Sequence, residues 1–184
     1  LLEAFVVVGD LSKKNKTLLF VGTKPSIRDI IEESASKINQ PFMSDRWIGG
    51  LLTNFSIIRK RMDYFEGLKR DKISGDLEKK YKKKEIVVIS KELERLEHNF
   101  RGVVALRKIP DALFIIDPKE EITALREAQK VNIPVIAVVS TDIDPTGITH
   151  IIPANDSART SISYILNRIV EAWNENKNIS PNEK

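Results

Sequence analysis

The feature that most constrains the fold is a series of short apolar runs, each followed by a helical pattern. The runs are Thr17–Val21, Ala112–Ile116 and Pro134–Val139. A strand that is apolar at nearly every position is buried on both faces, and strands that alternate with amphipathic helices are typical of a parallel sheet. The sequence therefore predicts an α/β protein with a doubly wound parallel sheet.

Turn and cap signals predict the elements between these runs. Asp117 followed by Pro118 is a typical helix start, and Asn155 is a typical cap for a C-terminal helix. Apolar residues at helical spacing follow both signals. The further elements expected are a turn at 22–25, a helix at 27–38, a strand at Pro41–Ser44, a short strand at His150–Ile152, and a loop at 142–147.

The middle of the chain breaks this rhythm, because apolar residues there follow a heptad spacing that is typical of paired helices. Ser74–Asp76 and the basic run Lys79–Lys84 lie between the two seams and are expected to form a tip. The sequence thus predicts an antiparallel coiled-coil helical hairpin inserted into the sheet domain. The seams are Phe55, Ile58, Met62 and Phe65, then Ile86, Ile89, Leu93, Leu96 and Phe100. The expected parts are an α/β sheet domain at 1–53 and 102–176, the hairpin insertion at 54–101 and a polar tail at 177–184.

Charge is distributed unevenly along the chain. Between Arg46 and Lys108 there are 17 Lys and Arg against 9 Asp and Glu, whereas the rest of the chain has 13 against 17. Such a cationic segment on a mildly acidic body indicates a polyanionic partner. The absence of cysteine excludes disulfides and cysteine-ligated zinc. No run of about 18 apolar residues suggests a membrane span, and no signal-peptide pattern opens the chain.

The candidate RNA contacts lie in this cationic segment. Arg46 and Trp47 stand beside two glycines, where the guanidinium could pair with phosphate and the indole could stack on a base. The alternative is an indole buried at the hairpin base and an arginine in a salt bridge. Each basic cluster alone could be a solvated face, but together they favour phosphate contacts. The clusters comprise Arg59, Lys60, Arg61, Lys69, Arg70, Lys72, Lys79, Lys80, Lys82, Lys83 and Lys84.

Signals for catalysis are weak. The turn Val21–Pro25 lies where doubly wound folds bind phosphate, but it lacks a glycine-rich cradle, and Pro25 removes a backbone donor. Aspartates are expected to cluster at the carboxyl ends of strands, where they could bind a metal, although cap and turn roles explain several of them. The two histidines belong to no ligand set. We therefore expect no cofactor, no metal and no catalytic residue. The aspartates are Asp111, Asp117, Asp142 and Asp144, and the histidines are His98 and His150.

The segment Arg46–Phe55 resembles the signature of the small-subunit ribosomal protein "S two" family, of bacterial or organellar type. Leu19–Lys24 is similar to that family's first strand and turn, and Ile109–Pro118 is similar to its second signature. Glu121 and the triplet Arg126–Ala128 follow in the family's order, and the segments Asn132–Ala137 and Ile152–Asp156 match the next units. The family ordinarily has some tens of residues before the position that matches Leu1.

This resemblance implies a flavodoxin-like sheet with an inserted coiled-coil hairpin and a non-catalytic role. It implies a structural place on the small ribosomal subunit, on a cytoplasmic or organellar ribosome. The implied partners are small-subunit ribosomal RNA and other small-subunit proteins, including the large mRNA-binding protein numbered one, but neither a membrane nor a second copy of the chain. Arg46, Trp47 and the basic clusters are expected to touch RNA, and Thr53, Asn54 and Phe55 are expected to order the hairpin base.

Two other functions share this fold. A nucleotide-dependent enzyme would need the cradle that Thr23–Pro25 does not supply, since fold alone does not decide function. A free RNA-binding or assembly factor would differ only in how long it stays on the subunit.

Overall fold

The computed structural model describes residues 2–140 and 144–177, and it confirms the α/β class. Five strands form one all-parallel sheet in the order β2-β1-β3-β4-β5. The strands are β1 (Leu18–Val21), β2 (Phe42–Met43), β3 (Ala112–Ile116), β4 (Val135–Val139) and β5 (His150–Pro153). The helices are α1 (Leu2–Lys13), α2 (Arg28–Lys37), α3 (Phe55–Ser74), α4 (Asp76–Lys80), α5 (Lys83–Phe100), α6 (Ile122–Lys130) and α7 (Arg159–Lys177).

The sheet has an apolar core on each face. Helices α1, α2 and α7 cover one face, and α6 covers the other together with the near ends of α3 and α5. Side chains alternate along each strand: Leu18 and Phe20 of β1 face the first set of helices, while Leu19 and Val21 face the second. All residues of β1, β3 and β4 are buried, as the continuous apolar runs predict.

Three helices end in the same way before a strand. Asn15, Asn39 and Asn132 have φ of 49°, 53° and 55° and follow α1, α2 and α6. The next amide then reaches back to the last turn, for example from Gln40 N to Ala35 O at 2.9 Å. Asparagine tolerates this left-handed conformation, so it ends the helix and turns the chain into the following strand.

Helix α1 was not among the predicted elements. Its first eight residues are almost uninterruptedly apolar, so they carry no clear helical period. The helix packs along α7, where Ala4 and Val8 are buried and the Ser12 hydroxyl donates to the Trp173 carbonyl at 2.7 Å. Tertiary packing therefore fixes a helix that its pattern alone does not indicate.

Cap residues also show small differences from the sequence predictions. Asp117 Oδ1 accepts N–H groups from Lys119 and Glu120, but the regular part of α6 begins only at Ile122. Asn155 Oδ1 accepts from Ser157 and Ala158, and α7 begins at Arg159. The predicted loop at 142–147 and the predicted tail at 177–184 lie partly outside the described residues.

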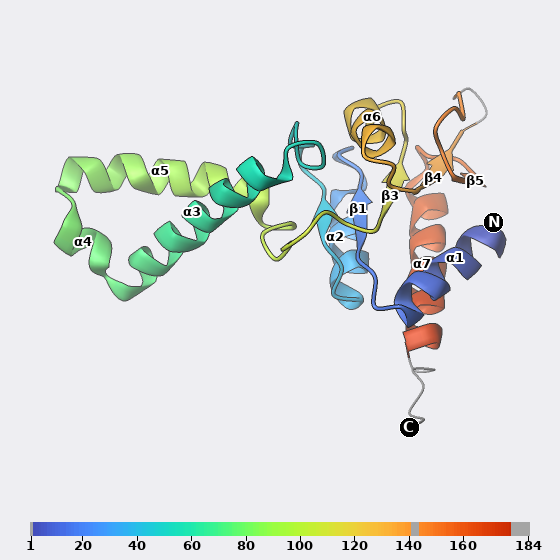
Figure 1. Ribbon diagram of the computed structural model, residues 1–184, viewed down its shortest axis with the longest axis horizontal. Helices are drawn as coiled ribbons and strands as arrows, with labels where there is room; N and C mark the ends of the chain where they lie inside the picture. The colour runs from blue at the N-terminus through green and yellow to red at the C-terminus, as the bar shows by residue number, and fades with distance from the viewer. Residues whose placement is uncertain (1, 141–143, 178–184) are drawn as a thin grey trace.

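The chain leaves the sheet after β2, runs through α3, α4 and α5, and returns to β3 (Figure 1). We call α3–α5 the arm. At the expected tip the short helix α4 forms with Leu77 buried, and Gly75 (φ 74°) makes the left-handed break that separates α3 from α4. The arm helices pack closely near the body and diverge toward α4.

No helix in the described ranges combines the length and apolar content needed to cross a bilayer.

The return from the arm is tied to the edge strand β2. Phe42 N donates to Gly102 O at 3.0 Å, which occupies a backbone group of this short strand. A Cβ on Gly102 would lie 2.2 Å from the Phe42 carbonyl oxygen. The close approach of two backbones therefore requires glycine at this position.

Gly102→Ala is expected to destabilise the protein by about 1–3 kcal/mol, because the backbone must move to admit the methyl group. The measurement is chemical denaturation of the full chain. Gly49→Ala is the matched control, since a Cβ there meets nothing within 4 Å. Equal stabilities for the two variants would contradict this account of the junction.

Candidate nucleic-acid interface

The loop that joins β2 to the arm is organised by one carboxylate. Glu127 of α6 is only 7% exposed and accepts five hydrogen bonds from residues 47–53. Its Oε1 accepts from Trp47 Nε1 at 3.0 Å and from Gly50 N at 2.7 Å. Its Oε2 accepts from Leu52 N at 3.0 Å and from the amide and hydroxyl of Thr53, each at 3.2 Å. A segment without regular secondary structure is thereby fixed on a helix.

The two oxygens of Glu127 accept hydrogen bonds from N–H and O–H groups of this irregular loop. Gly50 adopts a φ of 87°, which presents its amide to the carboxylate and favours glycine. Burial raises the pKa of the Glu127 carboxyl, but the hydrogen bonds outweigh burial and hold the pKa below its usual 4.5. The carboxyl is therefore charged at neutral pH, and each bond it accepts is charge-assisted.

Apolar side chains of the same loop fill the junction between body and arm. Trp47, Leu51 and Leu52 are buried in the cluster that also contains Ile58 and Phe100 at the near ends of the arm helices. Phe55 is partly buried against this cluster. The arm therefore leaves the body from a packed base, which fixes its direction.

Arg59 forms a second tie at this junction. Its Nη1 donates to the carbonyls of Val104 and Leu106 at 2.7 and 2.8 Å, and its Nη2 lies 2.6 Å from both Asp63 Oδ1 and Glu66 Oε2. The side chain is 12% exposed. Arg59 thus joins the first turns of α3 to the segment that returns from α5, and most of its donors are already used.

A third tie is a charged cluster around Asp45. This carboxylate lies 3.1 Å from Arg28 Nη1, 2.9 Å from Arg101 Nη2 and 3.5 Å from His98 Nδ1. Arg101 also pairs with Glu32 of α2. The cluster connects α2 to the end of α5.

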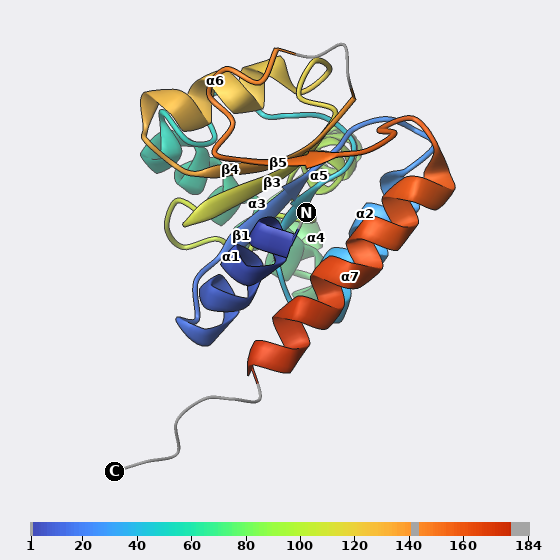
Figure 2. The same cartoon turned by 90° about the vertical axis from the view of Figure 1, so that its right-hand side faces the viewer.

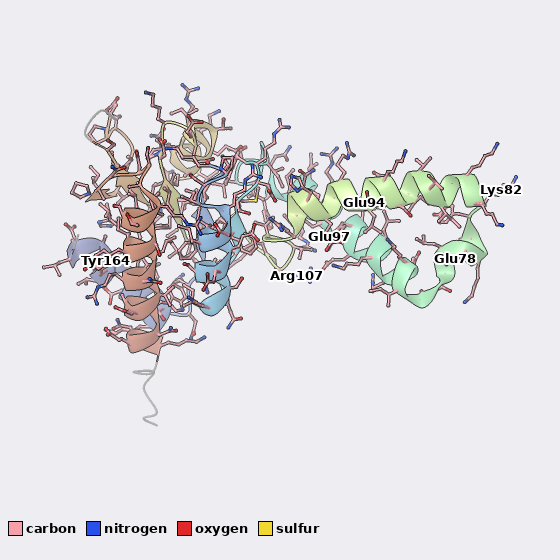
Figure 3. The ribbon with its side chains drawn as sticks, turned by 180° about the vertical axis from the view of Figure 1, so that it is seen from behind. Glu78, Lys82, Glu94, Glu97, Arg107 and Tyr164 are labelled. Atoms are coloured by element: carbon pink, nitrogen blue, oxygen red, sulfur yellow. The ribbon has the colours of Figure 1, made fainter. Side chains whose placement is uncertain are left out.

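The predicted RNA-binding cations of the arm divide into two groups. Four of them form ion pairs: Arg59 as described, Lys69 with Glu97, Lys79 with Asp76 and Lys80 with Asp71. The others are exposed and have no acidic partner within 4.0 Å among the described residues. These free cations are Lys60, Arg61, Arg70, Lys72, Lys82, Lys83 and Lys84. Lys82 lies at the far end of the arm, whereas Glu97 lies nearer the body (Figure 3).

Arg46 and Trp47 are separated by the fold. The Arg46 side chain is exposed, whereas Trp47 is 8% exposed and its indole N–H is bound to Glu127. This is the buried tryptophan of the alternative interpretation. Thr53 is held by Glu127, whereas the side chain of Asn54 caps no N–H group in the described part of the chain.

The carboxyl edge of the sheet is occupied by the protein's own charges. Glu121, 3% exposed, accepts the Thr23 amide at 2.7 Å, in the turn where related folds bind phosphate. Burial raises the pKa of this carboxyl, and the neighbouring Asp117 and Glu120 raise it further, against the Thr23 hydrogen bonds. Lys24 Nζ lies 2.5 Å from Asp117 Oδ2. The Glu121 carboxyl group therefore occupies the Thr23 amide that a bound phosphate would need.

Among the described aspartates Asp111 lies apart from Asp117, so the expectation for Asp111 is wrong. Asp111 precedes β3 and so lies at the amino edge of the sheet, where Oδ2 accepts Thr17 N at 2.9 Å and Oδ1 pairs with Lys16. Asp144 accepts from Thr146 in a turn, and Asp142 lies outside the described residues. His98 and His150 lie 3.5 Å from Asp45 and Glu3 respectively. No group of three potential metal ligands occurs within the described ranges.

Comparison with known proteins identifies the family. A family model described as "Ribosomal protein S2" matches residues 1–176. A protein of Dictyoglomus thermophilum described as "Small ribosomal subunit protein uS2" is 42% identical over 181 residues, which cover 98% of this chain and 73% of the relative. The chain belongs to the ribosomal protein S2 family. It is a structural, non-enzymatic constituent of the small ribosomal subunit.

In this member of the S2 family, the residue that organises the arm base was not among the predicted site residues. From the sequence, Glu127 was noted only as the middle residue of the triplet Arg126–Ala128, with no predicted role. The sequence did contain a signal, because an acidic residue falls between Leu125 and Ala128 on the apolar side of α6. The structure shows that this residue, Glu127, is buried. Its donors, however, are 74 to 80 residues away in the sequence.

Glu127→Gln is expected to lower the free energy of unfolding by roughly 2–4 kcal/mol at pH 7, since an amide nitrogen would face N–H donors. Because the folded-state pKa of Glu127 lies below 4.5, its contribution is present above pH 4.5 and is lost as the pH falls through the folded-state value. The stability difference between wild type and variant should therefore shrink on acidification. Glu94→Gln, on an exposed position of α5, should change stability by less than about 0.5 kcal/mol. A difference that stays constant from neutral to acid pH would disprove the charged hub.

ATP and NAD are expected to bind no more tightly than millimolar, because the Glu121 carboxylate repels phosphate from the first strand–helix turn. Isothermal titration calorimetry of the full chain measures this directly. Micromolar binding of either nucleotide would overturn this assignment of the carboxyl edge.

Proposed function

We propose that the arm is the element by which this S2-family protein grips small-subunit ribosomal RNA. The observation that supports the proposal is the group of seven arm cations that are exposed and lack an acidic partner among the described residues. Residues 54–101 contain 14 Lys and Arg against 9 Asp and Glu, so the arm has cations in excess of its own acids. Unpaired cations on a projecting element suit contact with a phosphate backbone.

We further propose the division of the chain into a flavodoxin-like sheet domain, 1–53 with 102–176, and an inserted antiparallel coiled coil, 54–101. The strand order β2-β1-β3-β4-β5 supports the first part, since flavodoxin-like folds share it. Burial of Ile58, Met62, Leu93 and Leu96 supports helix pairing along the inner half of the arm. In this arrangement the sheet domain carries the arm and the arm makes the contacts.

The predicted contacts receive different roles in this proposal. Arg46, exposed beside the arm base, and the seven free cations touch RNA phosphates. Lys69, Lys79 and Lys80 share their charge with neighbouring acids and contribute less. Trp47 and Arg59 act as positioning residues, because Trp47 is buried, Arg59 is largely covered, and both are hydrogen-bonded within the junction. Thr53, Asn54 and Phe55 belong to the same junction.

Protein partners extend the proposal beyond RNA. Other small-subunit proteins, including the large mRNA-binding protein numbered one, are proposed partners on the strength of the family resemblance. Exposed apolar side chains on the arm, among them Ile57, Tyr64 and Ile73, offer surface for such contacts. We propose that the chain acts as a single copy on the subunit.

Charge reversal at Lys60 and Arg61 is expected to weaken binding to small-subunit ribosomal RNA and to flatten its salt dependence. Each lost phosphate contact should reduce the slope of log K against log salt by about 0.7–0.9. Filter binding across a salt series measures both effects. The matched control reverses Lys14 and Lys130 on the sheet domain. Arg59→Gln should instead lower stability, with little change in slope.

Equal slopes for the arm variant and wild type would rule out this grip. Residence on the subunit is a separate measurement, made by sedimentation of small subunits at high salt. Stoichiometric retention supports a resident component, whereas transient, low occupancy would favour a free assembly factor.

A further inference from the structure

The segment that returns from the arm to β3, residues 102–108, lines a cavity that the proposed RNA contacts do not use. The cavity has a volume of about 590 Å³ and lies at the amino edge of the sheet, because its wall includes Thr17 before β1 and Pro41 before β2. It is therefore remote from the carboxyl edge, where folds of this topology commonly bind cofactors. Arg107, which lines the cavity, lies where the arm meets the body (Figure 3). The volume is within the range of cavities that hold a ligand.

Arg59 sets the direction of two backbone amides in this segment. Its Nη1 donates to the carbonyl oxygens of Val104 and Leu106 at 2.7 and 2.8 Å. In a trans peptide unit, the N–H group points opposite to the carbonyl group of the same unit. The amides of Ala105 and Arg107 belong to the same two peptide units as these carbonyls, and both units are trans. Both N–H groups therefore point away from Arg59, in a similar direction.

These two amides are available to a ligand. Within the described part of the chain, neither Ala105 N nor Arg107 N donates to a protein acceptor. Both residues are exposed, and both line the cavity. Successive backbone N–H groups that converge on one space form a binding site for carboxylate or phosphate oxygens. The return segment thus presents a pair of anion-binding amides to the cavity.

The charge around the cavity also favours an anion. None of its lining residues in the described ranges is acidic, whereas Arg107 and Lys108 are cationic. Lys108 shares Asp111 with Lys16, so these three side chains leave one positive charge at the rim. The guanidinium of Arg107 pairs with Glu66 of α3, so this residue offers its backbone amide rather than its side chain. An anion at the two amides would therefore meet a positive rim.

The lining of the cavity suits a peptide better than a nucleotide. Nucleobases are commonly held by stacking on aromatic side chains, and none of the described lining residues is aromatic. The cavity instead offers hydroxyl and amide side chains, which bind peptide groups, beside the buried side chain of Leu106. These polar lining residues are Thr17, Ser36, Asn39 and Gln40.

We infer that this cavity is a docking site for an acidic side chain of an extended protein segment, whose carboxylate accepts the amides of Ala105 and Arg107. The inference rests on the part of the proposed function that concerns protein partners, and it is independent of the RNA grip. Lys108 stabilises the charge of the incoming carboxylate, and the polar lining side chains contact the peptide groups beside it. Arg59 is the positioning residue of the site, because its two carbonyl contacts direct both donors.

The test titrates an end-capped pentapeptide, Gly-Leu-Glu-Leu-Gly, into the isotope-labelled full chain and follows the amides by NMR spectroscopy. The amide proton resonances of Ala105 and Arg107 should shift downfield and saturate, because both protons gain a charged acceptor. The matched probe carries Gln in place of Glu. It should bind roughly 5- to 50-fold more weakly, since its hydrogen bonds are no longer charge-assisted. Both probes are compared on the wild-type chain, so this readout does not depend on how any variant folds.

A variant pair tests the location of the site. Ala105→Glu places a carboxylate in the cavity, and it should bind the Glu probe roughly 5- to 30-fold more weakly than Ala105→Gln, which has the same size and no charge. Thr160→Glu, at an exposed position of α7, is the matched charge control and should bind as wild type does. Chemical denaturation of each variant verifies that the fold is retained.

Each other outcome overturns the inference in a distinct way. Unshifted Ala105 and Arg107 amides at the highest probe concentration remove the site. Equal affinities for the Glu and Gln probes, or for the Ala105→Glu and Ala105→Gln variants, remove carboxylate recognition. An oligouridylate that shifts the same amides at lower concentration than the Glu probe replaces the protein segment with RNA.

The proposed RNA grip is tested separately. Ala105→Glu should bind small-subunit ribosomal RNA as tightly as wild type in the filter assay. Weaker binding would assign the cavity to RNA, which overturns this inference and leaves the grip of the arm standing. An unchanged salt slope in the Lys60 and Arg61 variant, with the peptide results as expected, would instead overturn the grip and leave the docking site standing.

Discussion

The Glu127 carboxylate is the interaction on which the rest of the structure depends. It gathers the indole of Trp47, three backbone amides and the Thr53 hydroxyl into one hydrogen-bonded junction. Without it, the Trp47 indole N–H and the Leu52 amide would be buried and unpaired, at a cost of about 1–3 kcal/mol each. With it, an irregular loop becomes as defined as the helix that carries it. A projecting arm is useful in an assembly only if its direction is fixed, and this junction fixes it.

At the turn where folds of this topology commonly bind ligands, the sheet domain carries its own charged groups. In folds of this strand order the ligand lies at the carboxyl edge, near the turn after β1. Here the Thr23 amide is taken by Glu121, and Lys24 is taken by Asp117. Internal carboxylates thus supply the negative charge that a nucleotide would bring. The same scaffold that serves enzymes elsewhere carries, in this S2-family chain, the projecting arm.

The cations of the arm region fall into two groups that differ in their contacts. Near the body, Arg59 and Arg101 use their guanidinium groups to hold backbone carbonyls and neighbouring acids. Farther out, and on the outer face of α5, cations such as Lys83, Lys84 and Lys91 are exposed and have no such partners among the described residues. Arginine suits the first task because its planar fork binds several acceptors at once. The number of cations alone does not distinguish the two groups, because a paired and an unpaired side chain each add one positive charge.

The sequence by itself determined the α/β class, the strands β1, β3 and β4, the cationic segment and the family, because these are carried by local runs, spacing and motifs. It did not determine helix α1, whose apolar residues show no helical period until α7 packs against them. It placed Asp111 with Asp117, although the two flank β3 and so lie at opposite edges of the sheet. Only the tertiary structure decided that Trp47 is buried, that Arg59 is a tie and that Glu127 is the hub. The physical reason is that these roles come from hydrogen bonds between residues some 45 to 80 positions apart, and such partners become neighbours only when the chain folds.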